Sequence, residues 1–260
     1  MTVYSTKKQL EDIVTYLSAY MRIPYFQDET IPGQVMEKII SLVHESAIQL
    51  KTYDYVDVYL PNDVGWQVKS TKDSTPITWK RAKISDSNEM ITASEKSPED
   101  RQRLGDAIID FCNEHVVESR NKYKLKEIGY SRLIMYNDGT AVYFERLIST
   151  VNKSNIFDKN DYEWHWSDQK KDTKKEQLTA LHGTNEETGE KAFAWHGRGE
   201  NQLHFTGERE WWPNVIIPSI EGQINFSEDG HAMAFKLPSG KVSWKDLVAF
   251  LDGKVDSSCV

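Results

Sequence analysis

The stretch DVYLPNDVGWQVKST, residues 57–71, has the pattern of two β-strands joined by a turn. The first strand carries Asp57, and the second carries Gln67 and Lys69 among apolar and β-branched residues. Side chains two residues apart in a strand point to the same face of a sheet, so Gln67 and Lys69 share a face. With a loop at residues 61–65, Asp57 faces Lys69 across the hairpin, and all three polar side chains converge on one side of the sheet.

The periodicity on either side of this hairpin predicts an α/β protein with a mixed sheet flanked by helices, followed by a β-rich C-terminal half. Expected helices cover residues 6–20, 34–50 and 98–121, and a last one starts at Ser243; expected strands cover 53–60, 65–71 and two segments around the Asn-Asp-Gly turn within 130–148. Residues 76–84 fit a strand or a short helix, and residues 85–97 fit a loop.

The character of the chain changes near residue 150. The segment 151–161 is polar and resembles a linker, and the sequence beyond it has short strands, many aromatic residues and frequent turns. We therefore expect a catalytic domain at residues 1–150 and a β-rich recognition region at residues 151–260.

The composition indicates the cellular compartment and limits the classes of binding partner. The 260 residues hold 32 basic and 40 acidic side chains, and a net charge of −8 argues against a general nucleic-acid coat protein. The chain starts without a signal-peptide pattern, no apolar run approaches the ~20 residues of a membrane span, and Cys112 and Cys259 are the two cysteines. We expect a cytoplasmic protein that does not enter a membrane.

The polar residues of the hairpin suit phosphodiester hydrolysis. That reaction needs a nucleophilic water and neutralisation of the phosphate charge, and a divalent cation can supply much of both. Magnesium prefers oxygen ligands, which the Asp57 carboxylate and the Gln67 carbonyl offer, and Glu37 on the preceding helix could add another. Lys69 could position or deprotonate the attacking water.

An acid on one strand, a short gap and Glu/Gln-x-Lys on the next strand resemble the signature of the PD-(D/E)XK nuclease superfamily, which includes type II restriction endonucleases. Asp57, Gln67 and Lys69 match its central residues, and Glu37 matches a helix acid found in several members. The resemblance covers roughly residues 31–85 and extends at most to residue 148. No proline precedes Asp57, and glutamine stands where an acid is usual, so the number of metal ions stays open. The resemblance implies a Mg²⁺-dependent, sequence-specific endonuclease acting on double-stranded DNA.

Basic and polar clusters supply candidate DNA contacts. Lysine and arginine neutralise phosphates, whereas arginine, asparagine and glutamine can read base edges in the major groove. We expect phosphate contacts from Lys72, Lys80, Arg81, Lys170, Lys171, Lys174 and Lys175, and base contacts from Arg198, Asn201, Gln202 and His204. The four residues expected to contact bases could equally well belong to an ordinary sheet with an aromatic core and charged turns.

Other interpretations remain open at this stage. The runner-up nuclease is a structure-directed or transposition-type enzyme, and the rival from another class is a non-catalytic β-rich binding protein whose tryptophans could stack sugars. His165, His182, His196 and His204 match no compact zinc motif in their spacing, so we expect structural or polar-contact roles for them. The recognition sequence, the cleavage position and the oligomeric state, including a homodimer, are left open.

Overall fold

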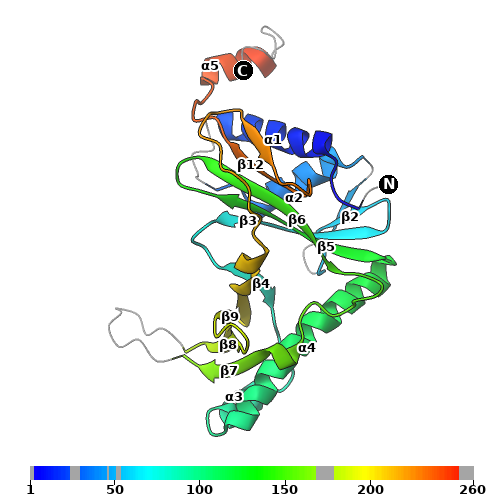
Figure 1. The fold of residues 1–260 in the computed structure, drawn as a ribbon, viewed down its shortest axis with the longest axis vertical. Coiled ribbons are helices and arrows are strands. Elements are labelled where there is room, and N and C mark those ends of the chain that lie inside the picture. The colour runs from blue at the N-terminus through cyan, green and yellow to red at the C-terminus, as the bar shows by residue number, and fades with distance from the viewer. Residues whose placement is uncertain (1–2, 24–29, 46, 51–53, 168–178, 252–260) are drawn as a thin grey trace. The chain divides into compact units, whose positions relative to one another are not determined.

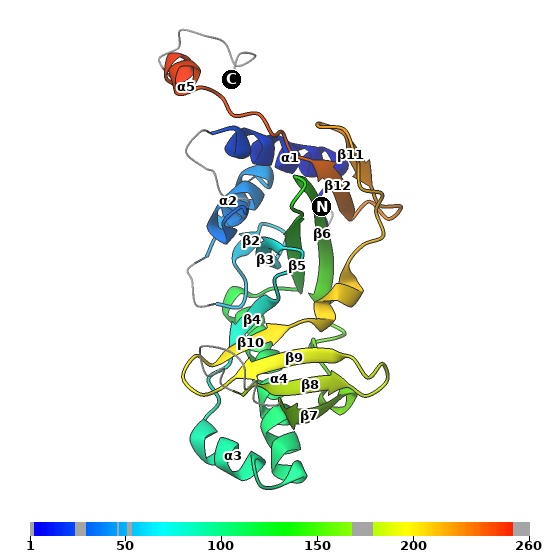
Figure 2. The same ribbon diagram turned by 90° about the vertical axis from the view of Figure 1, so that its left-hand side faces the viewer.

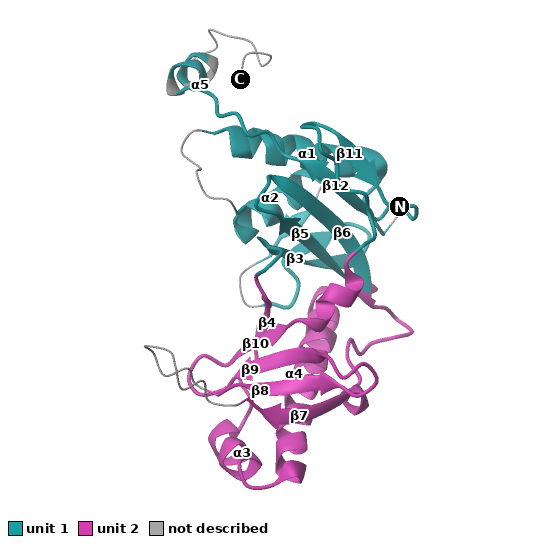
Figure 3. Cartoon of the chain, turned by 60° about the vertical axis from the view of Figure 1, so that its left-hand side comes forward, with its two compact units in different colours: residues 1–74, 129–147, 213–260 teal, residues 75–128, 148–212 magenta. Residues whose placement is uncertain are grey.

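The computed structural model describes residues 3–23, 30–45, 47–50, 54–167 and 179–251. The chain forms two compact units, drawn in different colours in Figure 3. Unit 1 comprises residues 1–74, 129–147 and 213–260, and unit 2 comprises residues 75–128 and 148–212. Each unit is assembled from segments that are distant in the sequence, and these units cut across the division at residue 150 that we expected.

Unit 1 is built on a seven-stranded sheet with the strand order β1-β2-β3-β5-β6-β12-β11, and helices α1 and α2 pack on it (Figure 1). Its elements are α1 (Lys7–Arg22), α2 (Gly33–Val43), β1 (Ile48–Gln49), β2 (Val58–Leu60), β3 (Val64–Lys72), β5 (Glu127–Met135), β6 (Thr140–Ser149), β11 (Ile224–Phe226), β12 (Ala232–Lys236) and α5 (Trp244–Leu251).

Helix α1 follows directly from its sequence. The Thr6 side chain accepts a hydrogen bond from the Gln9 backbone N–H, and the Gln9 side chain accepts one from the Thr6 backbone, which is a capping box. The apolar residues at helical spacing, Leu10, Ile13, Val14 and Leu17, are all buried. The expected helix at residues 6–20 is confirmed.

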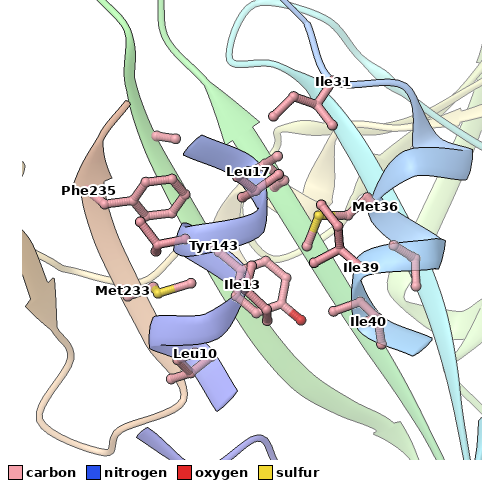
Figure 4. Close-up of a cluster of buried hydrophobic side chains, with 14 of the residues drawn as sticks. Leu10, Ile13, Leu17, Ile31, Met36, Ile39, Ile40, Tyr143, Met233 and Phe235 are labelled. Carbon is pink, nitrogen blue, oxygen red and sulfur yellow. The ribbon is translucent and has the colours of Figure 1, made fainter. Parts of the chain in front are cut away.

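The core of unit 1 lies between the two helices and the sheet. Figure 4 shows α1 and α2 contributing side chains such as Ile13 and Met36, which meet Tyr143 and Phe235 from the strands. Trp66 of β3 belongs to the same cluster and is 2% exposed. Burial on this scale is the main source of the unit's stability.

The sheet of unit 1 is mixed. Trp66 of β3 packs against Gly129 of β5, and further along both strands the Asp73 N–H donates to the Met135 carbonyl at 3.1 Å. Because these contacts follow the same order along both strands, β3 and β5 run parallel, whereas β2 and β3, like β6 and β12, are antiparallel. The expected α/β fold with a mixed sheet and helices is confirmed.

Unit 2 is built on a five-stranded sheet with the order β4-β10-β9-β8-β7, whose strands run antiparallel (Figure 2). Its elements are β4 (Ile77–Arg81), α3 (Ser87–Ser94), α4 (Pro98–Tyr123), the 3₁₀ turns η1 (Lys159–Asp161) and η2 (Gly207–Trp211), β7 (Tyr162–Trp166), β8 (Leu181–Asn185), β9 (Lys191–His196) and β10 (Gln202–Phe205).

Helix α4 packs on this sheet. Ser97 caps its start by accepting from the Asp100 N–H at 3.1 Å, with Pro98 in the first turn, as the sequence predicts. Gly105 lies against the ring of Trp164, and the next turns bury Ile108, Ile109, Cys112 and Val116. The sheet face that α4 covers is therefore the core of unit 2.

Three local expectations are wrong. The helix expected at 34–50 ends at Val43, because His44 adopts an extended backbone with φ −96° and ψ 101°. The loop expected at 85–97 contains α3, which starts after Asp86 in the left-handed conformation. The expected linker at 151–161 packs into unit 2, where Phe157 is 4% exposed.

None of the helices in the described part of the chain combines the length and the apolar composition that a membrane span requires.

Candidate functional site

The strand expected at 53–60 is shorter in the structure: β2 begins at Val58, so Asp57 directly precedes it, and the hairpin of β2 and β3 holds Asp57 beside Gln67. The Asp57 N–H donates to the Trp66 carbonyl, and Asp57 Oδ2 accepts from the Val68 N–H, both at 2.8 Å. Trp66 and Val68 are the sequence neighbours of Gln67, so these two hydrogen bonds hold Asp57 next to it. The carboxylate thus stabilises the backbone of β3 and lies at its middle.

The expected register of this hairpin is wrong by two residues. Val58 pairs with Trp66 and Leu60 with Val64, so the turn is residues 61–63 rather than 61–65. Asp63 closes it with φ 64°, a left-handed conformation that aspartate tolerates. A two-residue shift keeps every side chain on its face, but it replaces the expected Asp57–Lys69 pairing with Asp57 beside Gln67.

Gln67 and Lys69 face away from the helical core. Val58, Trp66 and Val68 belong to the cluster under α1 and α2, and alternation along the strands turns their neighbours to the opposite face. Gln67 is 3% exposed, and its Oε1 has no hydrogen-bond partner among the described residues. Lys69 is half-buried. A buried amide oxygen without a partner is costly, so this position calls for an explanation.

Glu37 is not brought together with Gln67 and Lys69. It lies on α2 and accepts a hydrogen bond from the Gln49 side chain of β1 at 2.8 Å. Its helix packs on the Trp66 face of the sheet through Met36 and Ile39. Glu37 therefore belongs to the opposite side of the sheet from Gln67.

Arg132 is a residue of this face that the sequence analysis missed. It is 2% exposed on β5, and its Nη2 donates to Thr71 Oγ1 of the neighbouring strand at 2.7 Å. Leu133 and Met135 point into the helical core, so Arg132 shares the face of Gln67 and Lys69. An arginine inside the otherwise uncharged strand segment YSRLIMY was the available signal.

Few side chains on this face could act as metal ligands. Within the described ranges, no three histidine, cysteine, aspartate or glutamate side chains are grouped so that they could hold a metal ion. The Asp57 carboxylate and the Gln67 amide oxygen are two neighbouring oxygen ligands that the hairpin offers to a cation. Magnesium in phosphate-processing sites commonly takes one or two carboxylates and completes its coordination with water and substrate phosphate. The residues present fit such an ion when a phosphate is bound as well.

The expected phosphate contacts belong to different parts of the chain. Lys72 ends β3 in unit 1 and is half-buried, whereas Lys80 and Arg81 lie on β4 in unit 2. The four lysines of the 170–175 cluster (Lys170, Lys171, Lys174 and Lys175) lie outside the described residues.

The expected base-reading residues belong to unit 2. Arg198 forms an exposed ion pair with Glu95. Asn201 has a left-handed backbone with φ 52°, and its carbonyl accepts from the Ala82 N–H at 2.8 Å. Gln202 and His204 lie on β10, are half-buried and alternate with the buried Leu203 and Phe205, so they face away from the core.

Three tryptophans of unit 2, Trp79, Trp164 and Trp195, are buried in its core, whereas Trp166, Trp211 and Trp212 are half-buried. Trp195 is 0% exposed and its indole N–H donates to the Ala82 carbonyl at 3.2 Å, while Trp164 is 3% exposed. Trp79 stacks edge-on against Phe205 and Trp211. Stacking on a sugar requires an exposed ring face, which the buried Trp164 and Trp195 do not offer.

A row of histidines crosses the other face of this sheet. His165 of β7 lies opposite His182 of β8, which lies opposite Ala194 of β9, which in turn lies opposite His204 of β10. His196 lies two residues further along β9 on the same face. Burial lowers the pKa of His182 to about 4 and also lowers the pKa of His204, with smaller effects from neighbouring charges.

Comparison with protein-family models found no match for this chain, and comparison with the curated proteins and with the solved structures found no significant match.

Proposed function

We propose that the protein is a magnesium-dependent endonuclease that cleaves double-stranded DNA at specific sequences. One observation carries the proposal: two hydrogen bonds with the backbone of β3, one of them accepted by the carboxylate, hold Asp57 beside the buried Gln67, and β3 also carries Lys69. An acid, an amide oxygen and a lysine in this arrangement are the groups that metal-assisted phosphodiester hydrolysis needs.

The unpartnered oxygen of Gln67 supports a cation at this face. A buried amide oxygen without a hydrogen bond costs roughly 1–3 kcal/mol, which a bound cation or its water would offset. The neighbouring Asp57 supplies the negative charge, and the DNA phosphate would complete the coordination. When bound, magnesium would polarise the phosphate and lower the pKa of its water.

The chain's own cations have distinct roles in this proposal. Lys69 is two residues from Gln67 on the same face, so its ammonium group can orient the attacking water and neutralise charge on the phosphate. Arg132 holds Thr71, two residues beyond Lys69, at 2.7 Å and is a positioning residue for this end of β3.

The test is cleavage of plasmid DNA with magnesium by the purified full chain. The Asp57→Asn variant keeps a carbonyl oxygen that can accept from Val68 and loses the charge, so we expect cleavage to collapse while the fold survives. Asp63→Asn is the matched control, because it makes the same change in the turn of the same hairpin. Lys69→Ala should likewise abolish cleavage, with the exposed Lys38→Ala as its control.

The cleavage pattern separates the alternatives. Discrete bands from linear and supercoiled plasmid support a sequence-specific endonuclease, and cutting only of branched or transposon-end substrates supports the structure-directed nuclease. Wild-type cleavage rates in both Asp57→Asn and Lys69→Ala would contradict the proposed site. DNA binding without cleavage by wild type under all metals would favour a non-catalytic binding protein.

A further inference from the structure

The strand register of unit 2 places side chains from five neighbouring strands in one row, on the sheet face that α4 does not cover. The strands lie side by side in Figure 2. His165 lies opposite His182, His182 opposite Ala194, Ala194 opposite His204, and His204 opposite Thr78. Residues directly opposite each other on neighbouring strands point to the same face, so this row crosses the sheet from β7 to β4.

A second row of polar side chains runs beside the first. His196 of β9 lies opposite Gln202 of β10, which lies opposite Arg81 of β4. His196 is two residues from Ala194, and Gln202 is two residues from His204, so both rows share one face. Arg81 is exposed, and His196 and Gln202 are half-buried.

The pairing of β4 with β10 decides which basic side chain belongs to this face. The register of the two strands shifts, so that Lys80 pairs with Leu203 and Arg81 pairs with Gln202. Leu203 is 0% exposed in the core. Burial raises the pKa of the Cys112 thiol to about 12, and the Lys80 ammonium opposes this effect from the core side of the sheet. Arg81 therefore supplies a guanidinium group to the outer face, and Lys80 does not belong to it.

We propose that this face of unit 2 reads base edges in the major groove of double-stranded DNA. We name it the reading face and define it by Arg81, His182, His196, Gln202 and His204. The inference rests on the proposed function, because it names the surface with which the endonuclease would recognise its sequence. It does not involve the proposed magnesium site.

The structure changes the set of base contacts expected from sequence. Gln202 and His204 belong to the reading face, whereas Arg198 lies between β9 and β10 and forms an ion pair with Glu95. The carbonyl of Asn201 accepts from the Ala82 N–H, which fixes the start of β10. The contributions of Arg81, His182 and His196 come from cross-strand pairing.

The side chains of the reading face carry the hydrogen-bonding groups that base edges require. Arginine pairs with guanine and glutamine with adenine, each through two hydrogen bonds. Burial lowers the pKa of His182 to about 4 and also lowers that of His204, so both rings are neutral near pH 7. A neutral imidazole has one donor and one acceptor, which suits a base edge, whereas a phosphate offers only acceptors.

The His204 ring is held in place before any ligand binds. It forms a hydrogen bond with the backbone of Ile77 on β4. A contact made by a side chain that is already ordered loses less conformational entropy on binding. His204 is therefore a preorganised group in the middle of the reading face.

The dimensions of the sheet match those of the groove. Neighbouring strands lie about 4.8 Å apart, so β8, β9 and β10 span roughly 10 Å, and the major groove is about 12 Å wide. Ala194 in the central strand carries only a methyl group, which lets the backbone approach the bases between His182 and His204. Along β10, Gln202 and His204 are about 6.8 Å apart, which corresponds to two base steps of about 3.4 Å.

The experiment is selection of bound duplexes from a pool of synthetic DNA with a randomised central segment, with calcium in place of magnesium. The full-length wild type should select a consensus sequence. Arg81→Ala and Gln202→Ala should each lose discrimination at one position by about 5- to 150-fold, the value of one good bidentate contact. Arg103→Ala, an exposed arginine of α4, and Gln223→Ala, an exposed glutamine of unit 1, are the matched controls and should select the wild-type consensus. Circular dichroism checks the fold of each variant.

The outcomes separate this inference from the nuclease proposal. If folded Arg81→Ala and Gln202→Ala select the wild-type consensus with full discrimination, the reading face is overturned and the nuclease proposal stands. Plasmid cleavage by a wild type that selects no consensus also overturns the reading face alone. A wild type that neither selects nor cuts DNA contradicts both proposals.

A change in the DNA gives a second test that does not depend on the folding of variants. 7-Deazaguanine and 7-deazaadenine remove the N7 acceptor from the major-groove edge of a purine and leave base pairing intact. Wild-type protein should bind consensus duplexes with these purines at the positions of the arginine and glutamine contacts at least fivefold more weakly. Unchanged binding at every consensus purine would show that the bases are not read from the major groove and would overturn the proposal.

Discussion

The Ser5 hydroxyl donates a hydrogen bond of 2.5 Å to Oε1 of Glu145, a residue 140 positions away in the chain. The Ser5 backbone N–H reaches Oε2 of the same carboxylate at 2.8 Å, and the Tyr143 hydroxyl reaches Oε1 at 2.8 Å. Glu145 is 6% exposed. One buried carboxylate therefore ties the segment before α1 to β6 in unit 1, and burial, the main effect, raises its pKa.

Replacing Glu145 by glutamine should destabilise unit 1. The amide of glutamine has one acceptor oxygen, so its NH₂ group must face a donor that the carboxylate now satisfies. Leaving one buried donor without a partner costs about 1–3 kcal/mol. Urea unfolding followed by circular dichroism measures the loss, and Glu45→Gln, an exposed glutamate of the same unit, should change the midpoint little. Equal urea midpoints for the two variants would show that the hydrogen bonds of Glu145 do not stabilise unit 1.

His44, the residue after α2, completes this network and makes it sensitive to acid. Its Nε2 lies 2.9 Å from the Ser5 hydroxyl, and its Nδ1 lies 3.3 Å from the amide nitrogen of Gln9. Because Ser5 donates to Glu145, the ring donates through Nε2 and accepts at Nδ1, which is a neutral tautomer. Burial lowers the pKa of His44 from 6.5 to about 4.

The free energy of unfolding should therefore decrease as the pH falls from about 6.5 to about 4. In the unfolded chain His44 is protonated below about pH 6.5, whereas in the folded protein it is protonated only below about pH 4. Between these values a falling pH therefore stabilises the unfolded state relative to the folded one. Between neutral pH and about pH 5 we expect a loss of about 2 kcal/mol from this residue. Urea unfolding at several pH values measures it, and His44→Gln should lose less stability over this interval. Parallel curves for the two proteins would rule out His44 as the source.

Gly105 of α4 should not tolerate alanine, although alanine is the better helix former. A Cβ at this position would lie 2.2 Å from Cγ and Cδ1 of Trp164, so helix and sheet would have to separate. We expect Gly105→Ala to destabilise the protein by about 1–3 kcal/mol despite a helix-propensity gain of about 1 kcal/mol. Gly33→Ala at the start of α2, where a Cβ meets no atom within 4 Å, is the control in thermal unfolding. A higher melting temperature for Gly105→Ala would contradict the packing argument.

Local sequence signals correctly predicted those helices and turns that are determined by residues close together in the sequence. The Thr6–Gln9 capping box, the Ser97 cap and the Asn-Asp-Gly turn depend on residues only a few positions apart, and the structure has a helix or a hairpin at each. Helix α3 escaped prediction because it starts without a side-chain cap and buries only Ile91 and Ser94. Its amphipathic signal is too weak to distinguish it from a loop.

The pairing between strands that are distant in the sequence could not be predicted from the sequence. The hairpin register depended on whether the turn was residues 61–63 or 61–65, and the left-handed backbone of Asp63 decided it. Arg132 joins the face of Gln67 only because β5 runs parallel beside β3 after the chain has formed part of unit 2. The histidine row likewise depends on cross-strand register, which no short motif encodes.

The Gln67→Glu variant is a sharp test of the proposed magnesium site, because position 67 is 3% exposed. A second carboxylate buried beside that of Asp57 is expensive because of desolvation and like-charge repulsion, so without metal this variant should be less stable than wild type by about 2–4 kcal/mol. A cation bound between residues 57 and 67 would offset that cost. We therefore expect magnesium with cognate DNA to raise the melting temperature of Gln67→Glu more than that of wild type.

Cleavage and stability can be followed on the same protein. Under the proposal, Gln67→Glu retains cleavage with an altered preference among magnesium, manganese and calcium, because the added negative charge changes the ligand set at the metal. Gln34→Glu, the same substitution at an exposed position of α2, should match wild type in its metal-dependent melting shift. If the Gln67→Glu shift is no larger than that of Gln34→Glu, residue 67 does not bind the metal, and the buried amide oxygen needs another explanation.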